Sequence, residues 1–148
     1  MRAVLILCTF LIAACEIIPR YNSEADTLIT GAYQDISTIL AKADLGAFTS
    51  KSSFAGEIDT YASIIGKLET AKISVGNKTP TNSRQPAAKT GATLDSIIGD
   101  CITQVKAFSD DHRDRGIIPG IGATQPVRVA CDAAARAIGV NRPLVGGN

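Results

Sequence analysis

Residues 94–108 read LDSIIGDCITQVKAF, and the spacing of their apolar side chains carries most of what the sequence says about the fold. These side chains recur at the period of one helix face: Leu94, Ile97, Ile98, Cys101, Ile102, Val105 and Phe108. We therefore expect an amphipathic helix here. It would begin at Thr90 or Thr93 and would be followed by the glycine- and proline-rich turn 116–122.

Three other segments show the same helical period and cover residues 25–43, 54–72 and 127–138. The residues expected to cap or end these helices are Ser23, Gly46, Ser52 or Ser53, Gly76, Thr124 with Pro126 in the first turn, and Gly139. Residues 76–89 are polar and contain two prolines, so we expect a long loop there. Because no strand-like alternation or internal repeat is present, we predict an all-α fold, a small four-helix bundle.

The composition excludes several classes of function. The chain has 148 residues, of which 45% are hydrophobic and 20% charged, enough apolar material for the core of one domain. Its 15 basic and 14 acidic residues leave a formal net charge of +1, which does not suit a protein that binds phosphate backbones. It has no Trp and only 5% aromatic residues, poor material for stacking on bases. We therefore expect no nucleic acid partner.

The amino-terminal segment has the features of an export signal. Met1 and Arg2 provide a positive end, and residues 3–14 follow without a charge. As a helix these residues would span about 18 Å, well short of the roughly 30 Å hydrocarbon core of a bilayer. The segment is therefore a better signal-peptide core than a transmembrane helix.

This segment ends in Ile12-Ala13-Ala14-Cys15, which resembles the lipobox of bacterial lipoproteins. The resemblance implies a signal peptide over residues 1–14 that is removed before Cys15. It also implies a diacylglycerol thioether on Cys15 and an acyl chain, such as palmitate, on the new amino terminus. Several acyl chains give a stable membrane anchor, whereas one gives reversible binding.

Glu16 follows the cysteine. In the sorting pattern of Gram-negative lipoproteins an Asp at this position favours retention in the inner membrane, so the resemblance with Glu16 implies the outer membrane, facing the periplasm. The remaining chain would then comprise a lipid-anchored tether over residues 15–22, a helical bundle domain over 23–140 and a flexible tail over 141–148. Two alternatives stay open: an ordinary secretory peptide cut near Ala14, and an uncleaved amino-terminal core helix.

The lipoprotein interpretation also predicts a disulfide. Of the four cysteines, Cys8 would leave with the signal peptide and Cys15 would be blocked by lipid. In an oxidising compartment Cys101 and Cys131 would then pair, which stabilises the fold by roughly 3–4 kcal/mol on the chain-entropy model. The alternative is two buried free thiols.

Both cysteines fall on predicted apolar helix faces, but Cys101 lies about two turns farther from the connecting turn than Cys131. The turn must therefore run back along the third helix, or that helix must end near Phe108.

Residues 109–115, Ser-Asp-Asp-His-Arg-Asp-Arg, form the one cluster that invites a catalytic or metal-binding interpretation. His112 is the sole histidine, and the two arginines would oppose a cation, so we interpret the segment from Asp110 to Asp114 as a solvated, charge-mixed helix end. No nucleophile motif or phosphate-binding loop is present. The aromatic residues are interpreted as core: Tyr33, Phe48, Phe54, Tyr61 and Phe108. We therefore expect no enzyme, catalytic residue, metal or cofactor.

These observations favour a non-catalytic lipoprotein of the bacterial cell envelope that serves as a structural, accessory or protein-interaction subunit. Its partners would be the bilayer, through acylated Cys15, and another protein. Two alternatives remain: a periplasmic inhibitor or immunity protein that binds an enzyme or toxin, and a helical-bundle enzyme or carrier of a small apolar ligand.

Overall fold

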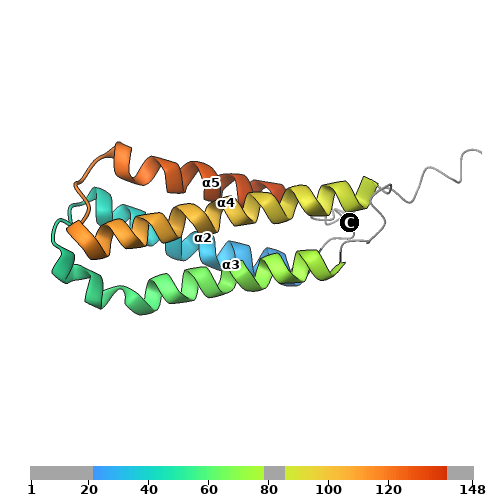
Figure 1. Cartoon of the computed structure of the whole chain (residues 1–148), viewed down its shortest axis with the longest axis horizontal. Helices are drawn as coiled ribbons and strands as arrows, with labels where there is room; N and C mark the ends of the chain where they lie inside the picture. The colour runs from blue at the N-terminus through green and yellow to red at the C-terminus, as the bar shows by residue number, and fades with distance from the viewer. Residues whose placement is uncertain (1–21, 79–85, 140–148) are drawn as a thin grey trace, which may run out of the picture.

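The computed structural model describes residues 22–78 and 86–139 of the chain (Figure 1). Within these ranges lie four α-helices and one 3₁₀ helix, and no strand. Their bounds are α2 (Ser23–Asp44), η1 (Lys51–Gly56), α3 (Ile58–Lys78), α4 (Pro86–Arg115) and α5 (Ile121–Gly139). The predicted all-α four-helix bundle is confirmed. The predicted signal peptide (1–14), the tether up to residue 21 and the tail (141–148) lie outside the described residues.

Successive helices are antiparallel, and each contacts two neighbours in the cyclic order α2, α3, α4, α5 (Figure 1). The connections from α2 to α3 and from α4 to α5 lie at the same end of the bundle, on the left in Figure 1. We call this end, formed by residues 45–57 and 116–120, the loop end. None of the helices in the described part of the chain is long and apolar enough to cross a membrane.

The helix ends follow the local sequence with some differences from our expectations. Asn22, not Ser23, caps α2, because its side-chain oxygen accepts a hydrogen bond from the Ala25 amide at 3.2 Å. Gly46 follows α2 with a positive φ of 81°, which confirms the expected stop. The second predicted helix is divided, because Ser50 caps the separate 3₁₀ helix η1 and α3 begins only at Ile58.

The ends of the other helices also differ from the predictions. The first helix beyond the predicted loop 76–89 begins earlier than expected, since α4 starts at Pro86, where a proline costs no hydrogen bond. The preceding helix α3 continues past Gly76 to Lys78. The last helix begins at Ile121, so Pro126 lies inside α5 instead of near its start.

The core runs the length of the bundle and consists of the faces predicted from the helical period. The buried apolar side chains include Ile29, Ile36, Leu40, Ile64, Leu68, Ile98, Val105, Phe108, Val127 and Ile138. Phe48 and Tyr61 are also buried, and Tyr33 and Phe54 are partly buried against this core, so the aromatic residues are core as predicted. Burial of these side chains is the main source of stability.

The two connections at the loop end are joined to each other. The amide of Ile117 donates a hydrogen bond to the carbonyl of Phe48 at 2.6 Å. Gly116 precedes it with a φ of 78°, and a Cβ at this position would lie 2.7 Å from the carbonyl oxygen of Thr49. Only glycine permits both this conformation and this close approach. The turn after α4 is therefore held against the turn after α2.

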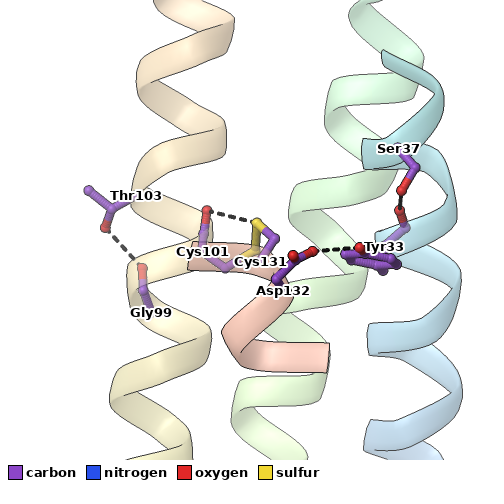
Figure 2. Close-up of a disulfide and its surroundings, with 7 residues drawn as sticks. All are labelled: Tyr33, Ser37, Gly99, Cys101, Thr103, Cys131 and Asp132. Carbon is purple, nitrogen blue, oxygen red and sulfur yellow. Dashed lines mark hydrogen bonds between the residues drawn. A yellow bond between two sulfur atoms is a disulfide. The ribbon is translucent and has the colours of Figure 1, made fainter. Parts of the chain in front are cut away.

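Cys101 of α4 and Cys131 of α5 have their Sγ atoms 2.04 Å apart, the distance of a disulfide bond, which confirms the predicted pair (Figure 2). The expected offset between the two cysteines is reduced because α5 begins early. Cys101 lies 14 residues before the end of α4, and Cys131 lies 10 residues after the start of α5. The remaining difference is about one helical turn. The third helix therefore does not need to end near Phe108, and it continues to Arg115.

Candidate functional site

Three features of the bundle could form a functional site: the charged end of α4, a buried histidine cluster and the seams between neighbouring helices. At the end of α4, Arg113 forms ion pairs with Asp110 and Asp114, both at 2.9 Å. These two carboxylates raise the pKa of the Arg113 guanidinium, mainly through the hydrogen bond with Asp114. Arg115 pairs with Asp111 at 2.8 Å. All these side chains are exposed, so for them the predicted solvated, charge-mixed helix end is confirmed.

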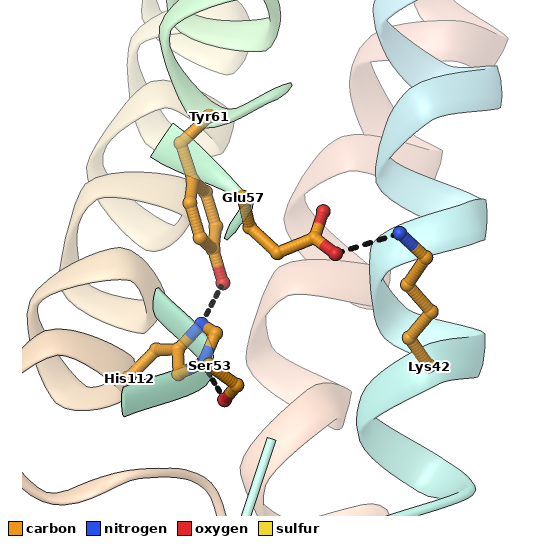
Figure 3. A network of polar contacts seen from close by, with 5 residues as sticks. All are labelled: Lys42, Ser53, Glu57, Tyr61 and His112. Atoms are coloured by element: carbon orange, nitrogen blue, oxygen red, sulfur yellow. Dashed lines mark hydrogen bonds and ion pairs between the residues drawn. The ribbon is translucent and has the colours of Figure 1, made fainter. Parts of the chain in front are cut away.

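For His112 the same prediction is wrong, because its side chain is fully buried at 0% exposure. Its ring stacks on Phe48, with ring centroids 4.2 Å apart, and meets the edge of Phe54 at 5.5 Å. The two ring nitrogens contact hydroxyls from other elements: Nε2 lies 2.8 Å from Ser53 Oγ of η1, and Nδ1 lies 3.1 Å from the Tyr61 hydroxyl of α3 (Figure 3). The histidine thus joins α4 to both elements. Ser53, Tyr61 and His112 are called the histidine cluster below.

The hydrogen bonds of this cluster define one proton arrangement. Ser53 Oγ donates to the carbonyl of Ser50 at 2.6 Å, so it accepts the proton of His112 Nε2. Nδ1 then carries no proton and accepts from the Tyr61 hydroxyl. This arrangement describes a neutral imidazole whose two nitrogens are both satisfied.

The surroundings of the cluster favour this neutral form. Burial lowers the pKa of His112, and the negative charge of Glu57 opposes this effect in part. Glu57 in turn pairs with Lys42 of α2 at 2.7 Å, which shares its charge with a second partner. Burial also raises the pKa of Tyr61, with a smaller contribution from Glu57, so its hydroxyl keeps its proton.

The cluster does not have the geometry of a nucleophilic site. In a serine–histidine pair the serine hydroxyl donates to the imidazole, whereas the Ser53 hydroxyl donates to the main-chain carbonyl of Ser50. The imidazole also has no exposed surface through which it could reach a substrate. The arrangement instead fastens η1 and α3 to the end of α4. Sequence reasoning missed this role because acidic and basic neighbours surround His112, although the residue continues the apolar period of Cys101, Val105 and Phe108.

The outer seams between neighbouring helices are closed by polar side chains in three of the four cases. The bridges are Asp35–Lys67 and Lys42–Glu57 beside α2 and α3, Glu69–Lys106 and Asp95–Lys72 between α3 and α4, and Asp44–Arg128 and Tyr33–Asp132 between α2 and α5. The Tyr33–Asp132 hydrogen bond lies beside the disulfide (Figure 2) and raises the pKa of Tyr33, as does burial. Each of these three seams therefore has polar bridges between its two helices.

The fourth seam, between α4 and α5, is different. Among the side chains that the structure describes no ion pair crosses it, and the buried disulfide is the bridge. Along its outer side runs a mainly apolar groove of about 770 Å³. We call it the α4–α5 groove, lined by Ile97, Asp100, Thr103, Gln104, Gly122, Gln125, Pro126, Val129, Ala130 and Ala133. Its volume is within the range of ligand-binding pockets.

The residues described contain no group of three or more His, Cys, Asp or Glu side chains that could hold a metal ion. The cavity among the core residues Leu40, Tyr61 and Phe108 has a volume of about 10 Å³, no more than one water molecule needs. No protein-family model, curated protein or solved structure matches this chain. The α4–α5 groove is therefore the candidate functional site, on its geometry alone.

Proposed function

We propose that this chain is a membrane-anchored periplasmic lipoprotein that acts as a non-catalytic protein-interaction subunit of the bacterial envelope. Acylated Cys15 would hold it on the outer membrane, and the helical bundle would bind another protein. The observation that carries the proposal is the disulfide distance between Cys101 and Cys131. Disulfides persist in oxidising compartments such as the periplasm, and this pair was expected from the lipobox interpretation.

The geometry of the bundle supports a binding function more than catalysis or transport of an apolar ligand. The buried histidine offers no surface to a substrate, and the small cavity within the core offers no room for a ligand. The α4–α5 groove, by contrast, is open to solvent and is lined by both apolar and polar side chains. This combination is typical of protein interfaces.

Metabolic labelling with palmitate in a bacterial host tests the anchor. We expect label on the wild-type chain and none on the Cys15→Ala variant. The mass of the labelled wild-type chain should show that residues 1–14 have been removed. Mass spectrometry without reduction should find no free thiol at Cys101 or Cys131. A wild-type chain without label, or label that persists after Cys15→Ala, would contradict the proposal.

A further inference from the structure

The inference concerns the one exposed carboxylate in the α4–α5 groove, that of Asp100. Almost every other carboxylate that the structure describes has a hydrogen-bond or ion-pair partner. The other exception, Asp59, lies in the first turn of α3, where the helix dipole favours a negative charge. Asp100 lies in the middle of α4, where no such dipole effect acts. The groove therefore has an uncompensated negative charge.

The position of the groove in the bundle suits an added helix. The groove lies between two antiparallel helices. A third helix can pack onto such a pair, with its side chains between those of its two neighbours. Gly122 has no side chain and Ala130 and Ala133 have small ones, so the backbone of an added helix can approach α5 closely. Val129, with 59% of its surface exposed, offers an apolar contact.

A second copy of this chain is a poor occupant because its described helices α2, α3, α4 and α5 offer no unpaired basic side chain among those that the structure describes. The Lys and Arg side chains described on these four helices are paired with carboxylates of their own chain. Lys51 is exposed and has no ion pair, but it lies in η1, a 3₁₀ helix of six residues without a buried side chain, which cannot act as an amphipathic helix. We therefore expect the positive side chain for Asp100 to come from a different protein.

We propose that the α4–α5 groove binds an amphipathic helix of a partner protein that covers Val129 with small apolar side chains and places a Lys or Arg against Asp100. Recognition of an amphipathic helix by an apolar groove is a common mode of protein binding, and the charge pair fixes orientation. Thr103, Gln104 and Gln125 add hydrogen-bonding groups to the lining of the groove. This inference rests on the proposed function as a protein-interaction subunit.

Site-specific photo-crosslinking in the full chain, expressed in bacteria, tests the proposal. A photo-crosslinking phenylalanine derivative replaces Val129 in one variant and Ile73 in the control. The two side chains are similarly exposed, at 59% and 62%, but Ile73 lies on α3 outside the groove. We expect a crosslinked protein from position 129 and none from position 73. Equal crosslinking at both positions, no crosslink at position 129, or a product of two copies of this chain would overturn the proposal.

A charge reversal tests the role of Asp100. Asp100→Lys should reduce the crosslink from position 129 by at least about tenfold, because it opposes the positive side chain of the partner. Asp59→Lys, which reverses an unpaired carboxylate on α3, should leave the crosslink unchanged. Mass spectrometry should identify the crosslinked peptide of the partner, whose sequence should show a helical apolar period and a Lys or Arg. Replacement of this basic residue of the partner by Glu should restore the crosslink in the Asp100→Lys variant. A crosslink that persists in Asp100→Lys, or a peptide without a basic residue, contradicts the proposal.

The same strains separate this inference from the proposed function. The palmitate label reports the anchor at Cys15, and the crosslink at position 129 reports the groove. A chain that carries the label but gives no crosslink supports the lipid anchor and contradicts helix binding in the α4–α5 groove. A chain that gives the crosslink but carries no label supports helix binding in the groove and contradicts the lipid anchor.

Discussion

The seam between α2 and α3 and the seam between α4 and α5 are held together in different ways. Across the first seam, the Lys67 ammonium lies 2.6 Å from the Asp35 carboxylate, and the Lys42 ammonium lies 2.7 Å from that of Glu57. Across the second lies a buried disulfide, and the groove beside it is exposed. Exposed ion pairs contribute about 0–1 kcal/mol each and occupy the outer surface, whereas a disulfide contributes a few kcal/mol from inside. A seam with an internal covalent bond can therefore keep its outer surface available for a partner.

The largest effect should follow loss of the disulfide. We expect Cys101→Ala with Cys131→Ala to lower the free energy of unfolding by about 3–4 kcal/mol, because the unfolded chain regains the entropy of a closed loop. The melting temperature of the domain should fall by about 10–20 °C. Urea denaturation of both proteins measures the difference. Addition of reductant should destabilise the wild-type domain but not the double variant, and a loss below about 1 kcal/mol would remove the distinction between the two seams.

A smaller effect is expected at the loop end, where hydrogen bonds connect the elements instead of ion pairs or a disulfide. His112→Phe keeps an aromatic ring against Phe48 but leaves the Tyr61 hydroxyl without its buried partner. This change should cost about 1–3 kcal/mol, the usual penalty for an unsatisfied buried polar group. Denaturation at pH 7.5 measures it. No loss of stability would show that the histidine cluster does not fasten η1 and α3 to α4.

The pH dependence of stability provides a related test. The pKa of His112 is lowered in the folded state, so the unfolded chain binds the proton more readily. The stability that the neutral imidazole contributes should therefore be present above about pH 6.5 and should be lost as the pH falls below that value. His112 is the one histidine of the chain, so its NMR signals report this titration directly. The His112→Phe variant should show a flatter profile between about pH 5 and 7, and an equally steep profile would contradict the assignment.

The ion-paired seam should respond weakly. Lys67→Ala removes the bridge to Asp35, and since both side chains are about one third exposed, we expect a loss of about 0.2–1 kcal/mol. The loss should shrink further in high salt, which screens exposed charges. Chemical denaturation at low and high salt measures this effect. A loss of stability as large as that of the disulfide variant would contradict the difference between the two seams.

The smallest effect on stability is expected in the groove itself. Val129→Ser changes an exposed side chain that faces the solvent in the isolated bundle, so its free energy of unfolding should remain within about 0.5 kcal/mol of wild type. Val127→Ser, two residues away on the buried face of α5, is the matched control and should be strongly destabilising. Similar losses in both variants would show that the groove is part of the core.

The sequence predicted the helices because their apolar side chains are regularly spaced, and it predicted the disulfide because the lipoprotein interpretation leaves two cysteines to pair. The apolar period of residues 94–108 identified a helix and placed Cys101 on its buried face. Polar helix ends were harder to locate, and the start of α4 at Pro86 lies in a segment whose composition is typical of a loop. The burial of His112 was missed because its charged neighbours dominate the local pattern. The α4–α5 groove was beyond sequence reasoning, since it depends on how closely two helices approach along their length.

The antiparallel order of the helices has a mechanical consequence. The first turn of α2 and the last turn of α5 lie at the same end of the bundle, opposite the loop end (Figure 1). A force that separates the two ends of the domain would thus peel these helices apart from that end, instead of sliding one along the other. The 30-residue separation between Cys101 and Cys131 could not be stretched while the disulfide is closed. Under tension the oxidised domain should release about 100 Å less chain than the reduced one.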